Sequence, residues 1–391
     1  LLASRSEGVE ISEDGERTGD LARVEAILFM AREAVGTRKL AQLAGLADGT
    51  EAHTLVRKLN RLYDAEGCAF RAEEVAGGVR EQLRFLVRYA ILAPSSNNSQ
   101  PWRFAIDGDC VRVLLDDRFW LRVCDPERRE MYLSAGCALE NLLIAAEHFG
   151  FGHHTDYLPD AGDPSLVAVV RFTRGGSPTA YRPPVLFEML TVRQTSHRPH
   201  LDRQLDDTVL SGLQGCCVEA GIVLRLYADR PTRRAVSSMV VRGDLQQFAD
   251  PAFRRELSVW VGQGVLGTPW LTSQLLRLMV RYVDIGRTQS RRDSELILSS
   301  PVLGVLATTR DDRTLQAQAG QVYERLSLAA TALGIQCQPM SQPVEIPDLM
   351  DELTRLISPP VLFPQHPFRM GYAPAERRRT LRRPLSEVFV A

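Results

Sequence analysis

Lysine is almost absent from this sequence. Lys39 and Lys58 are the two lysines among 47 basic residues, so arginine supplies nearly all of the positive charge. Arginine holds phosphate and carboxylate groups through two-point hydrogen bonds that lysine does not make. The 48 acidic residues bring the net charge to -1, which excludes a surface that is basic throughout, as general nucleic-acid binding requires. A local arginine-rich site remains compatible with this balance.

Metal-binding and membrane-spanning patterns are absent as well. The seven cysteines form no C-x-x-C pair, and none lies at zinc-ligand spacing from the seven histidines, so we predict no metal site. An odd cysteine count without a secretory signal favours a reducing compartment, and we predict a cytoplasmic protein. No apolar run approaches the roughly 18 residues of a membrane helix, so we expect no membrane partner.

The remaining composition is that of a globular protein with a sizeable core. Hydrophobic residues make up 45% of the 391 residues and charged residues 24%. At roughly 100–200 residues per domain, this length suits two or three domains. We predict a flexible lead, a small helical module and two larger segments that each mix helices and strands, an α+β organisation. The predicted boundaries are 1–19, 20–79, 80–180 and 181–391.

Hydrophobic periodicity predicts the secondary structure of the two larger segments. In the first, we expect helices over 81–92 and 131–149 and strands over 103–106, 111–115 and 165–173. In the second, we expect helices over 185–193 and 316–333, strands over 222–228 and 302–309, and mostly helix over 232–285 with a break at 262–269.

The two long helices of these segments have similar sequences. SAGCALENLLIAAEHFGF and QAGQVYERLSLAATALGI each carry Ala-Gly near the start and two adjacent alanines before a closing glycine. Laid over each other, they indicate weak internal symmetry between the two segments. The second segment would then be an elaborated repeat of the first.

The small module at 20–79 has the pattern of a winged helix, with three helices over 20–30, 37–44 and 50–64 and a hairpin over 68–79. VEAILFMAREAVGTRKLAQLAGL and LVRKLNRLYDAEGCAFRAEEVAGG resemble the first winged-helix domain of the chromosome segregation and condensation protein B family. The second winged helix of that family is absent, so its role is not carried over. A structural or protein-binding module and a DNA-contacting module stay open. Acidic residues around the basic positions of helix 50–64 favour the first, and we expect no nucleic-acid partner.

A polar loop without charge, APSSNNSQPWRF at 93–104, is the first candidate for chemistry. Pro94 ends the preceding helix, and Ser95, Ser96 and Asn98 follow it. Such a loop can present backbone N–H groups and side-chain amides to a polar ligand. The alternative is a decorated turn, since these residue types are common in turns.

Two arginine-rich segments are the second and third candidates. TVRQTSHRPH at 191–200 places Arg193 and Arg198 among hydroxyl groups, which suits a phosphate because charge-assisted two-point bonds are strong. A solvated basic turn with incidental histidines is the alternative. The tail ERRRTLRRPL at 376–385 would by itself be a solvated face. If the tail folded back over the second loop, the two would form an arginine-lined phosphate pocket.

Taken together and in this order, these segments resemble the nitroreductase-like flavoproteins. The resemblance also rests on DPERREMYLSAGCALENLLIAAEHFGF, AGQVYERLSLAATALGIQCQPMSQPVE and FRMGYAPAERRRTLRRPLSEV, and it covers residues 80–391. It is greatest to the two-halved branch associated with the dormancy regulon of mycobacteria. It implies an α+β fold, duplicated inside one chain as a pseudo-dimer and preceded here by the winged-helix-like module. Ordinary members are homodimers that bind FMN between subunits, so this chain would build one FMN site from its two halves.

The resemblance also assigns the FMN site residue by residue. It implies a phosphate and ribityl loop, a partner loop from the other half, a tail clamp, and a segment that passes the reactive edge of the flavin. His197 stands where the family often has Arg or Lys, with Arg198 beside it. No half carries both kinds of loop, so a second equivalent site is not expected. The residues, in the same order, are Arg193, Gln194, Thr195, His197 and Arg198; Ser95, Ser96 and Asn98; Arg382 and Arg383; and Gln338, Pro339, Met340 and Ser341.

The implied function is an FMN-dependent NAD(P)H oxidoreductase that reduces nitro- or quinone-type acceptors. The flavin would carry the chemistry, so no catalytic side chain is assigned. No G-x-G-x-x-G fingerprint occurs, which suits a nicotinamide donor that binds transiently. Two alternatives stay open: an FMN-binding or sequestering protein without turnover, lidded by residues 232–300, and a flavin-responsive regulator that uses the winged helix. A single chain that supplies both halves predicts a monomer.

Overall fold

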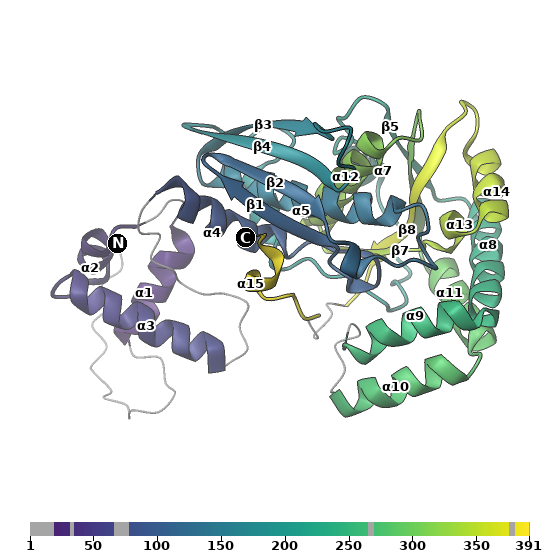
Figure 1. Ribbon diagram of the computed structural model, residues 1–391, viewed down its shortest axis with the longest axis horizontal. Helices are drawn as coiled ribbons and strands as arrows, with labels where there is room; N and C mark the ends of the chain where they lie inside the picture. The colour runs from purple at the N-terminus through teal and green to yellow at the C-terminus, as the bar shows by residue number, and fades with distance from the viewer. Residues whose placement is uncertain (1–18, 32–34, 66–77, 265–269, 375–379, 391) are drawn as a thin grey trace. The chain divides into compact units, whose positions relative to one another are not determined.

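The computed structural model describes residues 19–31, 35–65, 78–264, 270–374 and 380–390 (Figure 1). The chain divides into two compact units, Leu1–Gln82 and Leu83–Ala391. The first contains α1 (Gly19–Met30), α2 (Thr37–Ala44) and α3 (Gly49–Ala65), as the periodicity predicts. Leu21, Val24, Leu40 and Leu59 are buried between these helices. The predicted hairpin at 68–79 lies almost wholly outside the described residues, so the winged helix stays a prediction.

The second unit begins with one four-stranded antiparallel sheet, in the order β1-β2-β4-β3. The long helix α5 packs against β1, β2 and β3. Every residue of α5 from Glu130 to Glu147 is buried, so each of its charged groups needs a partner or a shifted pKa. The elements of this half are α4 (Val79–Ala90), β1 (Trp102–Asp107), β2 (Cys110–Leu115), α5 (Arg129–His148), β3 (Phe151–Tyr157) and β4 (Leu166–Arg174), with single 3-10 turns at Ser96–Asn98 and Asp117–Phe119.

A second four-stranded antiparallel sheet follows, in the order β5-β6-β8-β7. The long helix α12 packs against it. The elements of this half are α6 (Pro184–Met189), α7 (Asp207–Gln214), β5 (Ile222–Tyr227), β6 (Val302–Thr308), α12 (Arg313–Ala332), β7 (Ile335–Pro339), α13 (Gln342–Glu345), α14 (Pro347–Ile357), β8 (Phe363–Tyr372) and α15 (Leu385–Val388).

The two sheets repeat one arrangement, as the overlay of the two helix sequences predicts. In each, the second strand is followed by a long buried helix and then by an edge strand. Gly150 and Gly334 follow the two helices with positive φ values of 78° and 73°. The second strand of each sheet, β2 or β6, has a register shift against its neighbour β4 or β8. The second unit is therefore a duplicated α+β fold.

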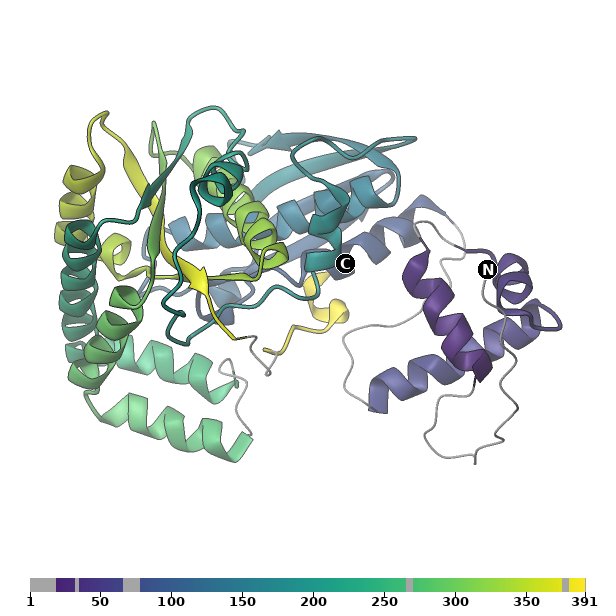
Figure 2. The same ribbon diagram turned by 180° about the vertical axis from the view of Figure 1, so that it is seen from behind.

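The second half differs from the first by a helical insertion between β5 and β6. The insertion consists of α8 (Arg230–Ala249), α9 (Pro251–Gly262), α10 (Trp270–Tyr282) and α11 (Gly286–Leu298). Figure 1 and Figure 2 both show α9 and α10 as a pair of helices that extends beyond the two sheets. The corresponding connection in the first half is the turn at Gly108, which has a φ of 60°.

The structure corrects several boundaries. Sequence periodicity misses β3, since FGHHTDY has no clear apolar alternation, and β8, since Pro364 and Pro367 suppress a strand signal. The helix predicted over 185–193 ends at Met189, which leaves Arg193 outside it. The helical region predicted to end at 285 continues into α11.

α5 and α12 pack on each other at two glycines. A Cβ atom on Gly136 would lie 1.8 Å from the carbonyl oxygen of Ala317, and one on Gly320 would lie 1.9 Å from that of Leu133. The Cys137 thiol also donates a hydrogen bond to the Gly320 carbonyl at 3.2 Å. Because the two backbones touch, no side chain fits between them at these positions.

We predict that Gly136→Ala lowers the free energy of unfolding by at least about 3 kcal/mol, because the methyl group would force the two helices apart. Gly212→Ala is the matched control, since Gly212 also lies in a helix and nothing lies within 4 Å of its added Cβ. This control should be neutral or stabilising, by up to about 1 kcal/mol. Urea unfolding of both variants measures the difference. Equal stability of the two variants would contradict the close contact.

Candidate functional site

A buried arginine, Arg369, holds loop 193–200 after α6, and the sequence analysis did not identify it. Arg369 of β8 donates to the backbone carbonyls of Ser196 and Arg198, at 3.0 and 2.8 Å. Its Nε donates to Oε1 of Gln338 at 2.7 Å. Burial lowers the pKa of Arg369 to about 10, well above neutrality, so the side chain stays charged. Arg369 therefore holds loop 193–200 against the end of β7.

Two of the predicted phosphate residues lie at the surface of this loop. The side chains of His197 and Arg198 are exposed. Nδ1 of His197 lies 3.0 Å from Nε2 of Gln338. Thr195 forms a bridge with Cys337 of β7, so the loop and the strand run side by side at this point. The structure thus brings the predicted Arg193–Arg198 loop and Gln338 together.

Arg193 is buried at the inner side of the loop. Its Nε lies 3.4 Å from Oε1 of Glu324 on α12. The structure gives the terminal nitrogens of Arg193 no hydrogen bond to any described residue, and the buried Oε1 of Gln194 has no partner there either. Guanidinium and amide groups left in this state are suited to bind a polar ligand.

Glu324 is fully buried beside Arg193. No described residue makes a hydrogen bond of normal geometry to either of its carboxylate oxygens. Burial raises the pKa of Glu324 to about 7, although the charge of Arg193 and the nearby amide of Asn141 favour the ionised form. The charge of Arg382 in the tail also favours the ionised form of Glu324 and so lowers its pKa.

The described tail residues contact the Pro-Ser-Ser loop of the first half, and the predicted contact with loop 191–200 stays a prediction. Nδ2 of Asn98 donates to the Leu381 carbonyl at 3.0 Å. Arg382 donates to Oδ1 of Asn98 at 3.1 Å and to the Leu92 carbonyl at 3.0 Å. Ser95 Oγ accepts a hydrogen bond from the backbone of Gln100 at 2.9 Å. The two halves are therefore joined at this loop.

The Pro-Ser-Ser loop has a strained backbone. Asn97, Asn98 and Gln100 have φ values of 49°, 51° and 53°, a region that residues with a Cβ rarely adopt. Ser96 Oγ donates to the carboxylate of Glu130, a buried residue of α5. Such strain persists only where surrounding contacts hold the loop, and it is common at ligand sites.

Arg383 has different hydrogen-bond partners from the adjacent Arg382. Its terminal nitrogens donate to the carbonyls of Gln100 and Trp102, at 2.9 and 3.2 Å, and to Asp116 at 3.2 Å. Its guanidinium also stacks on Phe119 at 3.8 Å. With these groups engaged, Arg383 anchors the tail to the first half. Arg382 is engaged as well, through Asn98, Thr380 and the Leu92 carbonyl, and the clamp role of both arginines stays a prediction.

The segment 338–341 contacts the loop through the side chain of Gln338, while residues 339–341 are engaged within the second half. Met340 is buried in the core of the second half, and its N–H donates to the Pro367 carbonyl at 2.9 Å. Ser341 precedes α13, where its carbonyl accepts from Val344 and Glu345. Pro339 ends β7 and is half-buried. This segment adjoins the Arg193 loop through Gln338 alone among the contacts given above.

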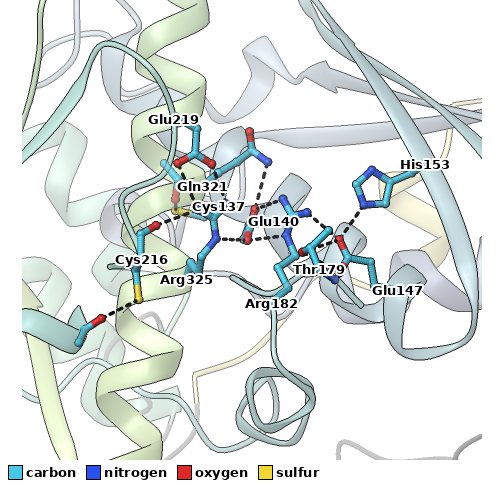
Figure 3. Close-up of polar contacts among 12 residues, drawn as sticks. Cys137, Glu140, Glu147, His153, Thr179, Arg182, Cys216, Glu219, Gln321 and Arg325 are labelled. Carbon is cyan, nitrogen blue, oxygen red and sulfur yellow. Dashed lines mark hydrogen bonds and ion pairs between the residues drawn. The ribbon is translucent and has the colours of Figure 1, made fainter. Parts of the chain in front are cut away.

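A second polar cluster lies at the corresponding place of the other helix (Figure 3). Glu140 of α5 aligns with Glu324 of α12 in the repeat. Arg182 donates to both oxygens of Glu140 at 2.8 and 2.9 Å, and Arg325 donates to Oε1 at 2.7 Å. Gln321 adds a hydrogen bond at 3.1 Å.

Further carboxylates complete this cluster. Arg325 also pairs with Glu219 at 2.7 Å, and Arg182 pairs with Glu147 at 2.7 Å. Burial alone would raise the pKa of Glu140, but the charges of the two arginines lower it to about 2. Each charge in the cluster therefore has a partner, which identifies it as structural rather than ligand-binding.

We predict that Glu140→Gln lowers the free energy of unfolding by about 3 kcal/mol or more at neutral pH, since it leaves two buried guanidinium groups short of a carboxylate. A lowered pKa means that Glu140 stabilises the fold above its ordinary pKa of 4.5, and that this contribution is lost as the pH falls toward 2. Wild type and variant should therefore converge in urea unfolding at acid pH. Glu219→Gln, which contacts Arg325 from a less buried position, should cost less. A gap that stays constant down to acid pH would refute the assignment.

Other kinds of site find no support in the described residues. No group of three or more His, Cys, Asp or Glu side chains among them is arranged to hold a metal ion. Across the described ranges, no helix has both the length and the apolar character to cross a bilayer.

Comparison with known proteins gives relatives along most of the chain. A Mycobacterium tuberculosis protein named "Putative NAD(P)H nitroreductase Rv3131" is 24% identical over 337 residues, which cover 79% of this chain and 91% of the relative. Another from that organism, "Putative NAD(P)H nitroreductase acg", is 26% identical over 325 residues, with 78% and 95% covered. No family model matches the chain.

Solved structures match about half of the chain. The FMN and NADPH-dependent nitroreductase NfnB from Sphigopyxis sp. strain HMH has a TM-score of 0.37 and 16% identity, covering 52% of this chain and 96% of that one. The FMN-dependent nitroreductase NfnB from Mycobacterium smegmatis, solved with NADPH, has a TM-score of 0.33 and 14% identity, covering 52% and 96%. TM-scores of this size do not establish a shared fold.

Proposed function

We propose that residues 83–391 bind one FMN and act as an NAD(P)H-dependent oxidoreductase on nitro- or quinone-type acceptors. The observation that carries this proposal is Arg193, a buried arginine whose terminal nitrogens have no hydrogen bond to any described residue. A buried guanidinium in this state is costly unless an anion completes it. The similarity to proteins named as NAD(P)H nitroreductases supports the choice of FMN as the source of that anion.

The residues around Arg193 fit the polar end of FMN. Arg193 would hold the phosphate through its terminal nitrogens, and Arg382, which the sequence resemblance assigns to the tail clamp, would assist from the tail. The unpartnered Oε1 of Gln194 would accept a hydrogen bond from a ribityl hydroxyl, and Thr195 lies next to it. Asn98 would face the cofactor from the other half, because it is hydrogen-bonded to Arg382.

When bound, FMN would supply hydride transfer from NAD(P)H to the acceptor. The chain's own contribution is to anchor and orient the cofactor. Arg369 fixes loop 193–200 by its backbone, and Arg383 fixes the tail that carries Arg382. Because both anchors are buried and hydrogen-bonded to the backbone, the loop and the tail sit on rigid supports.

We further propose that the protein is a cytoplasmic monomer. The six cysteines in the described part of the chain are unpaired thiols, which suits a reducing compartment. The Arg193 loop and the Pro-Ser-Ser loop come from one chain, so a second copy is not needed to complete the site.

We predict that wild-type protein copurifies with FMN and that Arg193→Ala loses it, while its fold survives. Removal of a buried charged contact should weaken FMN binding at least 30-fold, or about 2 kcal/mol. Gel filtration with visible absorbance measures retained flavin, and circular dichroism checks the fold. Arg291→Ala, at an exposed arginine of α11, should keep the flavin. Stoichiometric flavin in Arg193→Ala would show that the phosphate lies elsewhere.

We predict that NADPH or NADH bleaches the visible absorption of the bound flavin under anaerobic conditions, and that a nitro or quinone acceptor restores it. The measurement is a stopped-flow absorbance trace for each nucleotide. Borohydride or dithionite reduction of the same sample checks that the flavin is reducible. If chemical reductants bleach the flavin and neither nucleotide does, the protein binds FMN without this turnover.

A further inference from the structure

Glu140 and Glu324 occupy equivalent positions in the repeat but have opposite surroundings. Each lies four positions after the glycine at the helix crossing, Gly136 or Gly320. Both oxygens of Glu140 accept hydrogen bonds from arginine, whereas neither oxygen of Glu324 has a hydrogen bond of normal geometry from a described residue. The residue that follows Glu140 is Asn141, and the one that follows Glu324 is Arg325.

This exchange explains the difference between the two carboxyl groups. Arg325 reaches from α12 to Glu140, and Asn141 stands at the equivalent position of α5 beside Glu324. The amide of Asn141 carries no charge, so Glu324 has an ion pair with Arg193 alone among the described residues, whereas Glu140 is bound by two arginines. The Nε of Arg193 lies 3.4 Å from Oε1 of Glu324, and its two terminal nitrogens make no hydrogen bond to a described residue.

Few neighbouring groups can titrate with Glu324. The groups that face it are Arg193 after α6, Cys137 and Glu140 of α5, Cys337 of β7, Tyr323 of α12 and Arg382 of the tail. Burial raises the pKa of Cys337 to about 12 and those of Cys137 and Tyr323 well above their ordinary values, so all three stay neutral near pH 8. Glu140 stays ionised.

We propose that Glu324 is a positioning residue for the phosphate of the bound cofactor. Its carboxylate holds Arg193 by the Nε edge and shares the guanidinium charge with the phosphate, so the phosphate binds together with a proton from solvent, which bonds to a Glu324 oxygen. The inference rests on the proposed FMN site. It adds a proton to the binding equilibrium of that site.

Electrostatics determines whether binding takes up or releases a proton. A phosphate dianion on the far side of Arg193 disfavours the negative form of Glu324, because like charges in a poorly solvated site repel. The pKa of Glu324, about 7 before binding, is therefore higher in the complex, and binding takes up a proton. Affinity must then fall as the pH rises above 7, by at most about tenfold per pH unit. The phosphate itself is already a dianion there, since its second pKa is about 6.

The test measures proton uptake directly. FMN is titrated by calorimetry into apoprotein at pH 8, in two buffers of different ionisation enthalpy, and the dissociation constant is followed from pH 6.5 to 9. We expect wild type to take up a substantial fraction of one proton and to weaken with pH. Glu324→Gln should take up none, show a flat profile above pH 7, and bind FMN more tightly than wild type at pH 9. Riboflavin, which lacks the phosphate, should cause no such uptake in wild type.

Asp244→Asn is the matched control. Asp244 of α8 is also a buried carboxyl whose pKa burial raises to about 7, but it contacts Gln342 rather than Arg193. Asp244→Asn should keep the wild-type proton uptake and the wild-type change of the dissociation constant with pH. If Glu324→Gln does not fold, Asn141→Leu tests the same idea. It should shift the pH range in which FMN affinity falls to higher pH, because it removes an amide that favours ionised Glu324.

Three results would overturn the inference while leaving the FMN site intact. The first two are equal proton uptake in Glu324→Gln and wild type, and equal proton uptake with riboflavin and FMN. The third is a pH dependence of FMN affinity that Asn141→Leu does not shift. If wild type binds no FMN at any pH, the proposed function itself fails. The two failures are therefore distinguishable.

Discussion

The contact between the backbones of α5 and α12 determines which charged residues of these two helices are buried. Gly136 and Gly320 let the helices touch, so every residue along the contact is taken out of water. Glutamates one turn further along are buried by the same contact, whatever their function. A buried carboxylate must be paired with charge or become neutral. Arg325 of α12 and Arg182 before α6 neutralise Glu140 completely. Arg193 after α6 neutralises Glu324 only in part.

The difference between the halves has a thermodynamic meaning. The cluster at Glu140 is closed by its own side chains and stabilises the native state. The group around Glu324 is left short of hydrogen bonds, which costs stability. Proteins commonly carry such local deficits where a ligand acts, and other parts of the structure offset them. Here Arg369 and Arg383 hold the loop and the tail through several hydrogen bonds each and supply that support.

Much of the fold follows from sequence pattern, and the exceptions have physical causes. The long helices, the five predicted strands and the repeat depend on local signals, which the buried stretches of α5 and α12 carry clearly. β8 was missed because its two prolines look like a loop, although the strand lies between two others in the sheet. The predicted strands 103–106 and 111–115 meet at the expected turn.

The candidate site was only partly accessible to sequence reasoning. Loop 193–198 and Asn98 were identifiable from their residue types, and the contact of Asn98 with Arg382 follows from the fold. Arg369 and Glu324 were not, since a charge inside a buried element gives no local signal of its partner. Comparison of the two long helices offered one clue: each places a glutamate at the same position of an otherwise apolar stretch. The adjacent Arg382 and Arg383 have different hydrogen-bond partners, which their sequence does not indicate.

The exchange of asparagine for arginine beside the twin glutamates has a consequence for how such a site can vary. Two identical subunits carry one gene's residue at both symmetry-related positions, so any substitution there appears twice. A chain that holds both copies is free of that constraint: position 325 keeps a charge that pairs with Glu140, while position 141 brings an uncharged amide to Glu324. Covalent linkage thereby lets two equivalent carboxyl groups acquire different surroundings.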